Sequence, residues 1–204
     1  LRLADAVTTI SPWHVEFVRQ FNPNVHLIYN GYDPSQFYAE DIPMDTFYIS
    51  YIGRIYEFQS TALVEQAVRE LNLPHVELNI HTPDCRPIPL NAVGDELRRS
   101  SMALVLTNPN AKGMMTTKFF EALGCEKPIL CTPSDNGLLT KTIRDTNAGL
   151  ASSDMDEIKA FILEKYHEWQ QNGFTRQAVI NKEPFSRQQQ AQQFEQLFMQ
   201  CSKR

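Results

Sequence analysis

Two short segments of the chain carry residues that could bind a diphosphate. The first lies where the apolar run 47–52 ends at Gly53 and Arg54. Glycine lets a ligand approach the backbone closely, and an arginine guanidinium can form two parallel hydrogen bonds with a phosphate. An ordinary surface arginine after a strand is the competing interpretation, and the pair considered alone favours it.

The second segment covers residues 112–121 and follows another apolar run at 103–106. Helical spacing places Thr117, Lys118 and Glu121 on one face, and the free amides at the helix start suit a diphosphate. Glu121 would stand roughly 6–7.5 Å further along the axis, where a carboxylate can accept hydrogen bonds from two vicinal ribose hydroxyls. A surface ion pair between Lys118 and Glu121 explains the same spacing equally well.

The elements that must position these residues alternate along the chain. Nearly continuous apolar runs predict buried strands over 6–10, 25–29, 47–52, 76–80, 103–106, 129–131 and 149–151. Helical periodicity predicts helices over 61–71, 95–101, 114–123, 138–144, 154–169 and 185–201. The alternation indicates an α/β fold with a Rossmann-like, doubly wound parallel sheet of about six strands. Ligands of such sheets bind beyond the carboxyl ends of the strands, which here means near Gly53, near Thr82, in 107–118 and in 132–137.

Composition excludes several other classes of protein. The 204 residues are 42% hydrophobic and 21% charged, as in ordinary globular domains. The net charge of −5 argues against a nucleic-acid binder. No apolar run approaches the roughly 18 residues that span a bilayer. The four cysteines form no C-x-x-C pair, so a reduced, cytoplasmic chain is expected.

Common cofactor and metal motifs are missing from the sequence. It contains no G-x-G-x-x-G, no P-loop and no G-x-S-x-G, and its five histidines lack the spacing of metal ligands. Asp154 and Asp156 have the spacing of a divalent-cation motif, but they stand at the start of a strong helical pattern. We therefore expect Asp154 to contribute to a helix cap, and we expect no metal and no cofactor.

Taken in order, the motifs resemble the nucleotide-sugar-binding half of glycosyltransferase family 4. The resemblance spans about residues 4–155 and is carried by Ala4-Asp5-Ala6-Val7 with Ser11, Ile28-Tyr29-Asn30-Gly31-Tyr32-Asp33 with Phe37, Tyr51-Ile52-Gly53-Arg54, Lys118-Phe119-Phe120-Glu121-Ala122-Leu123 with Lys127-Pro128-Ile129-Leu130, and Asn147-Ala148-Gly149-Leu150. Several motifs in the family's order are a far stronger signal than any single one.

The resemblance implies one half of the two-domain GT-B architecture. Residues 1–204 would form a single donor-binding domain, with a core over about 4–180 and a C-terminal helix over 185–202. The N-terminal acceptor domain would be absent, and this chain alone would be inactive.

The implied activity is that of a retaining, metal-independent glycosyltransferase of the hexosyltransferase type, acting in cell-surface polysaccharide synthesis. A nucleoside-diphosphate sugar would be the co-substrate, with no other cofactor. A sugar or lipid-linked acceptor would bind through the missing domain, and the resemblance leaves room for peripheral membrane association of the full-length enzyme.

The resemblance also assigns roles to individual residues. The implied catalytic residues are Arg54 and Lys118, whose charges would stabilise the leaving diphosphate. The implied donor-binding residues are Gly53, Arg54, Thr116, Thr117, Lys118 and Glu121.

The sequence departs from the family pattern at three positions. Gln59 stands where a lysine is common, and Gly113 stands where a glutamate usually touches the transferred sugar. Glu126 replaces a helix-ending glycine, so the left-handed position there is expected to be either strained or rebuilt. Asn30-Gly31 is interpreted mainly as a tight turn. Two alternatives stay open: another GT-B enzyme such as a sugar-nucleotide epimerase, and a non-catalytic or degenerate α/β binding module.

Overall fold

The computed structural model describes residues 1–110 and 113–202, which excludes Lys112 of the predicted phosphate-binding segment. The strands are β1 (Val7–Thr9), β2 (Val25–Leu27), β3 (Phe47–Ile52), β4 (Val76–His81), β5 (Met102–Leu106), β6 (Ile129–Thr132) and β7 (Gly149–Ala151). The α-helices are α1 (Pro12–Arg19), α2 (Ala62–Leu71), α3 (Val93–Arg99), α4 (Thr117–Gly124), α5 (Leu138–Asp145), α6 (Met155–Asn172) and α7 (Arg187–Cys201). Among the described residues, none of these helices combines the length and apolar character needed to cross a membrane.

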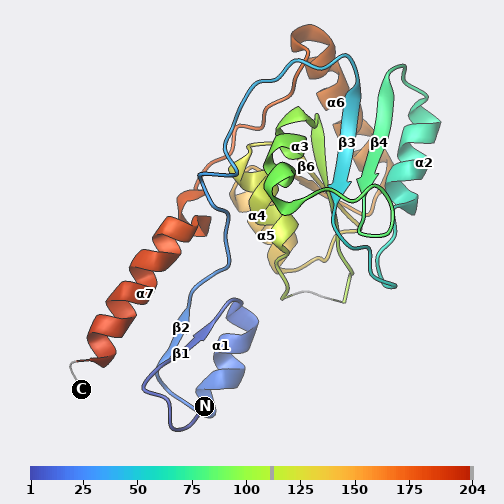
Figure 1. The fold of residues 1–204 in the computed structure, drawn as a ribbon. Helices are drawn as coiled ribbons and strands as arrows, with labels where there is room; N and C mark the ends of the chain where they lie inside the picture. The colour runs from blue at the N-terminus through green and yellow to red at the C-terminus, as the bar shows by residue number, and fades with distance from the viewer. Residues whose placement is uncertain (111–112, 203–204) are drawn as a thin grey trace.

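Five parallel strands form the main sheet, in the order β4-β3-β5-β6-β7 (Figure 1). The chain runs outward from β3 to β4 and then returns to β5 on the other side of β3, so the direction of winding switches there. Ile52 of β3 pairs with His81 of β4, which places the carboxyl ends of these strands side by side. The predicted α/β, doubly wound class is confirmed.

The main sheet has five strands where about six were expected. Every predicted strand is present, but β1 and β2 pair with each other in a separate two-stranded parallel sheet. An apolar run marks a segment that is buried and paired, but it carries no information on which strand is its partner. The sequence could therefore not assign these two strands to a sheet of their own.

Helices cover both faces of the main sheet. One core lies under α3, α4 and α5 and includes Phe119, Phe120 and Leu139. The opposite core lies under α2 and α6 and includes Phe47 and Trp169, whose rings meet edge to face. Fully burying one such side chain contributes about 1.5–3 kcal/mol to the free energy of folding. Packing on both faces therefore holds in place the strand ends that form the site.

A small lobe stands apart from the main sheet and consists of β1, α1, β2 and α7 (Figure 1). The chain crosses between the lobe and the main sheet twice, near Tyr32 and near Phe185. These two crossings lie side by side and are joined by a hydrogen bond of 3.0 Å from the Tyr32 amide to the Phe185 carbonyl. A Cβ on Gly31 would lie 2.1 Å from that carbonyl oxygen. Gly31 therefore permits a close backbone approach, and its φ is not among the positive values that a tight Asn-Gly turn requires.

Local signals for helix ends are largely confirmed. Asp154 caps α6 by accepting hydrogen bonds from the amides of Asp156 and Glu157. Of the two outcomes left open for Glu126, the structure has the left-handed backbone, with φ of 53°, and the Glu126 carboxylate forms an ion pair with Lys182. Helix α1 was not predicted, although Ser11 and Pro12 provide a standard cap-and-first-turn signal at its start.

Candidate functional site

A hollow of about 410 Å³ opens at the carboxyl ends of β3 and β4, against the first turns of α4. Its polar wall contains Gly53, Thr117, Lys118 and Glu121, and its other wall is largely apolar, with Ile52, Pro83, Pro87, Ile88, Leu90 and Val93. Four of the six predicted donor-binding residues thus lie around one space. The region 132–137, also expected near the site, instead borders a different hollow next to α5.

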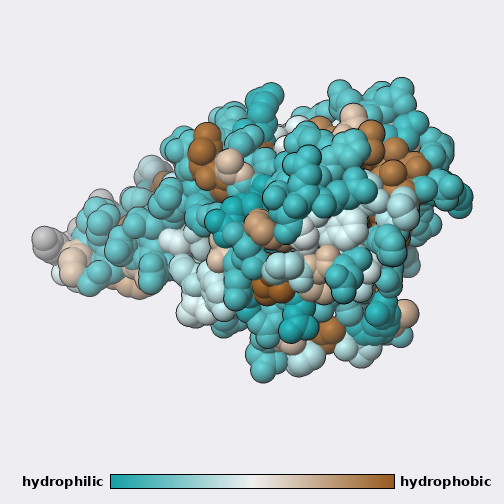
Figure 2. Space-filling model, turned by 90° about the horizontal axis from the view of Figure 1, so that it is seen from above, coloured by the Kyte–Doolittle hydropathy of each residue, from teal (hydrophilic) through white to brown (hydrophobic). Residues whose placement is uncertain are grey.

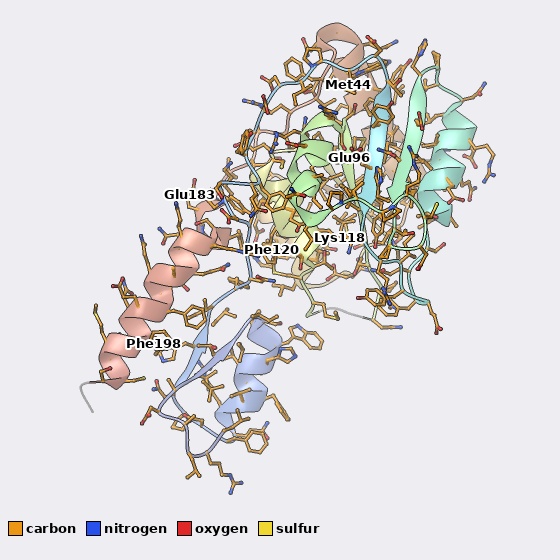
Figure 3. All side chains as sticks on the ribbon, viewed as in Figure 1. Met44, Glu96, Lys118, Phe120, Glu183 and Phe198 are labelled. Carbon is orange, nitrogen blue, oxygen red and sulfur yellow. The ribbon has the colours of Figure 1, made fainter. Side chains whose placement is uncertain are left out.

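Lys118 lies across Gly53, and this contact explains why residue 53 is glycine. A Cβ at position 53 would stand 2.5 Å from Cε and 2.7 Å from Nζ of Lys118. Gly53 also has φ of 133°, which side chains rarely adopt. The Lys118 ammonium is 5.2 Å from the centre of the Tyr51 ring, and burial lowers the pKa of this lysine. Figure 3 shows Lys118 beside the end of β3.

Glu121 points into the same hollow one turn further along α4. Burial raises its pKa to about 7, although the nearby charges of Lys118 and Arg187 act in the opposite direction. Within the described residues, no ion pair joins Glu121 to Lys118, so the alternative of a simple surface pair is not supported. A half-buried carboxylate with no hydrogen-bond or ion-pair partner among residues 1–110 and 113–202 can accept hydrogen bonds from a ligand.

The start of α4 supplies backbone donors to this space. Thr116 is the N-cap, and its hydroxyl accepts a hydrogen bond from the Phe119 amide at 3.4 Å. The helix therefore begins at Thr117, three residues later than the sequence pattern predicted. The first amides of a helix lack partners within it and attract anions, so the donors next to the hollow are those at Thr117 and Lys118.

Arg54 and Gln59 both lie in the loop after β3, but they differ in exposure and in hydrogen bonding. Arg54 follows Gly53 directly and is exposed, and its carbonyl accepts a hydrogen bond from the Tyr51 hydroxyl at 2.6 Å. Gln59 is bonded to backbone, because its amide donates to the Leu106 carbonyl at 2.7 Å and accepts from the Tyr56 amide. Gln59 thus fixes the loop to the end of β5, and the ammonium at the hollow comes from Lys118.

Gly113 is explained by a contact that the sequence did not indicate. A Cβ at this position would lie 2.6 Å from Cγ of Trp13, on helix α1 of the lobe. The Ser11 hydroxyl also donates to the Gly113 carbonyl at 2.6 Å. A glutamate cannot occupy position 113 without moving Trp13, so glycine here reflects the packing of the lobe.

Sequence reasoning missed His81, which closes the floor of the hollow. Its Nδ1 bonds to the Arg86 carbonyl at 2.8 Å, and its Nε2 lies 3.4 Å from the Glu96 carboxylate. The place of His81 at the end of β4 is the one sequence signal that could have identified it. Among the described residues, no group of three His, Cys, Asp or Glu side chains is placed to hold a metal ion.

The fold is shared with solved structures of GT-B glycosyltransferases. Sucrose-phosphate synthase from Thermosynechococcus elongatus matches with a TM-score of 0.68 and 17% identity, over 98% of this chain and 59% of that one. Anabaena Alr3699/HepE in complex with UDP and glucose matches with a TM-score of 0.72 and 14% identity, over 98% and 64%. A variant of S. aureus TarM, in complex with fondaparinux, alpha-GlcNAc-glycerol and UDP, matches with a TM-score of 0.62 and 14% identity, over 95% and 44%.

The chain therefore spans less than two thirds of the length of these structures. No protein-family model matches it, and no curated protein matches its sequence. At these identities the likeness shows the fold, and the function has to be argued from the site.

Proposed function

We propose that the hollow between β3, β4 and α4 binds a nucleoside-diphosphate sugar, and that the chain is the donor-binding part of a glycosyltransferase. The observation that carries this proposal is the joint placement of Lys118 and Glu121 beside Gly53 in one space. A cation, the first amides of α4 and, one turn on, a carboxylate that pairs with no other described residue suit a diphosphate followed by a ribose.

The geometry suggests how the donor would lie. The diphosphate would rest between the Gly53 backbone, the first amides of α4 and the Lys118 ammonium, with Arg54 closing over it from the loop. Glu121 would accept hydrogen bonds from the ribose hydroxyls. The base would then occupy the apolar end of the hollow, against Ile88 and Val93. The order diphosphate, ribose, base follows from the lining of the hollow. The charged groups suit the diphosphate and the ribose, and the apolar wall suits the planar base.

The chemical contribution of these residues would be to stabilise the leaving group. When the bond between the sugar and the diphosphate breaks, negative charge develops on the phosphate oxygens. Lys118, Arg54 and the helix amides would hold that charge, which is how fixed dipoles and cations lower a barrier without a metal ion. Arg54 and Lys118 are thus the proposed catalytic residues, and no resident cofactor is needed.

The finer features of the activity belong to the same proposal. We infer a retaining hexosyltransferase in which an N-terminal domain beyond this chain binds a sugar or lipid-linked acceptor. The family resemblance of the sequence motifs supports this reading, as it does a role in cell-surface polysaccharide synthesis at the cytoplasmic side of a membrane. The isolated chain would bind donor but not turn it over.

Calorimetric titration with UDP, GDP and ADP tests the proposal. We expect saturable binding of one nucleotide, weakened at least about tenfold when Arg54→Ala and Glu121→Ala are combined, because each removes a hydrogen-bonding charge. A matched control removes Glu65 and Arg69, an exposed carboxylate and guanidinium four residues apart on α2. Absence of binding by all three nucleotides, or equal weakening by the control, contradicts the proposal and favours a non-catalytic module.

A further inference from the structure

A second hollow, of about 610 Å³, lies where the lobe meets the main sheet domain. Helix α1 contributes Pro12, Trp13 and Glu16 to it, and the start of α5 contributes Asn136, Leu138 and Lys141. The chain segment that follows Gly113 lies between the two hollows. Gly113 at its start packs against Trp13 of the second hollow, and Lys118 at its end lines the first. None of the roles proposed above uses these residues.

Trp13 is the dominant surface of this second hollow. The side chain is 62% exposed, which is unusual for a tryptophan. It is nevertheless held in place, because Gly113 packs against its ring base and Ser11 fixes both partners. The Ser11 hydroxyl accepts from the Trp13 amide at 3.3 Å and donates to the Gly113 carbonyl at 2.6 Å. An exposed but positioned aromatic ring binds a ligand at a low cost in conformational entropy.

The opposite wall offers fixed polar groups. The Asn136 side-chain oxygen accepts from the Ser134 hydroxyl, and its backbone amide donates to the same hydroxyl at 3.1 Å. The side-chain NH2 of Asn136 has no acceptor among the described residues and can donate to a ligand. Lys141 carries an ammonium that already pairs with Asp145. Glu16 faces them from α1 and supplies an acceptor. The hollow thus combines one aromatic face with separate donors and acceptors.

This combination matches the chemistry of a pyranose ring. A pyranose presents a face of C–H groups, which are attracted to the negative face of an aromatic ring, and a rim of hydroxyls that need both donors and acceptors. The Lys141 charge is already paired with Asp145 and Glu16 adds a carboxylate, so the hollow has no net positive charge to attract an anion, and a wholly apolar ligand would leave the polar wall without partners.

We propose that Trp13 is the stacking platform of a saccharide subsite formed by α1 and α5. Within the function proposed above, on which this assignment of role rests, the subsite holds a sugar unit of the acceptor. The binding itself requires no nucleotide, so it can be measured separately from the donor site.

The chain suits a fluorescence test, because Trp13 is exposed and the second of its two tryptophans, Trp169, is buried. The probes are methyl α-D-glucopyranoside, methyl α-D-galactopyranoside, N-acetylglucosamine and maltose at millimolar concentrations, with open-chain sorbitol as the control polyol. We expect a saturable change in emission with at least one pyranoside and none with sorbitol. Saturation-transfer NMR on the same probes extends the measurement to variants without Trp13.

Variants on both walls separate stacking from general damage. Trp13→Ala should weaken binding roughly tenfold and Trp13→Phe by less, because a smaller ring keeps part of the contact. Asn136→Ala, which leaves Trp13 untouched, should also weaken it. Phe17→Ala is the matched control, since Phe17 is 58% exposed on the same helix and does not border the hollow.

Three results would overturn the subsite. They are no saturable signal with any pyranoside, equal responses to sorbitol and pyranosides, or equal losses from Trp13→Ala and Phe17→Ala. If nucleotides fail to bind while pyranosides still do, the donor function fails and the saccharide site stands. The reverse result removes the saccharide site alone.

Discussion

The two hollows of this protein are lined by elements that differ in how deeply they are packed. The first lies at the ends of β3 and β4, and helix α4, which carries its charges, rests on fully buried phenylalanines. The second lies at the seam with a lobe whose helix α1 contributes only Val18 to the buried residues. Burial in the first shifts the pKa values of Lys118 and Glu121, whereas the polar groups of the second stay close to solvent. The first hollow therefore holds partly buried charged groups, whereas the second holds solvent-exposed polar groups beside an exposed aromatic ring. The Gln-rich helix α7 of this lobe is mainly hydrophilic on the face seen in Figure 2.

The largest expected effect tests the foundation of the first hollow. Phe120 is completely buried beneath α4, while Phe17 is 58% exposed on α1. Phe120→Ala should lower the free energy of unfolding by about 3–5 kcal/mol, because it leaves a cavity as well as losing burial. Phe17→Ala should stay within about 0.5 kcal/mol of the parent. Chemical denaturation of both variants measures the difference, and similar midpoints would mean that the two regions are equally well anchored.

The next largest effect is expected from a substitution that disrupts the contact between Gly53, at the end of β3, and Lys118 of α4. Gly53→Ala places a methyl group 2.5 Å from Lys118 Cε at a φ of 133°, a conformation that costs about 1–3 kcal/mol for other residues. Lys118 must move, and affinity for the nucleotide that the parent chain binds should fall roughly tenfold. Calorimetry gives this value, and an alanine at 53 with unchanged affinity would separate Lys118 from the diphosphate. Binding of pyranosides at the second hollow should be unaffected.

The protonation of Glu121 sharpens the contrast further. Its pKa of about 7 means that the carboxylate becomes fully ionised only above neutral pH. The nucleoside-diphosphate sugars of uracil, guanine and adenine have no group of their own that titrates in this range, so affinity for the donor should rise between pH 6 and pH 8, by up to roughly tenfold. Glu121→Gln should remove this pH dependence and should also reduce the expected preference for the ribonucleotide over its 2′-deoxy analogue. A pH profile that survives in Glu121→Gln would have to come from another group.

The same shift makes a prediction for stability. The folded pKa of Glu121 is raised above the ordinary value of 4.5, so the folded state holds a proton that the unfolded state has lost between these two values. Stability should therefore fall as pH rises from about 4.5 to about 7, and Glu121→Gln should reduce that fall. Urea unfolding across this range provides the comparison. An identical pH dependence in the variant would contradict the burial of this carboxylate.

The smallest expected effect concerns the link between the two hollows. Gly113→Ala puts a methyl group 2.6 Å from Trp13 Cγ, and Trp13 is exposed enough to shift aside. We expect a change in Trp13 emission and a loss of roughly threefold in pyranoside affinity, with nucleotide affinity almost unchanged. A larger loss for nucleotides than for pyranosides would show that the segment after Gly113 serves the donor site first.

Much of the fold could be predicted because its signals are local. Apolar runs marked each strand, and helical periodicity located α2, α5 and α6 closely. The cap at Asp154 also follows from side chains and backbone within a few residues, whereas the left-handed Glu126 pairs with Lys182, 56 positions away. Gly53, Lys118 and Glu121 were identified as one candidate site because strand ends in a parallel sheet meet at one edge.

The sequence by itself therefore determined the strands, every α-helix except α1, their order and the residue types available at the strand ends. The tertiary structure alone decided that β1 and β2 leave the main sheet, that Lys118 crosses Gly53, and that Trp13 rests on Gly113. The bond between Ser11 and Gly113 joins residues 102 positions apart. Propensity and periodicity act over a few residues, whereas such contacts arise from the packing of the whole chain, and so does the burial that sets the pKa of Glu121.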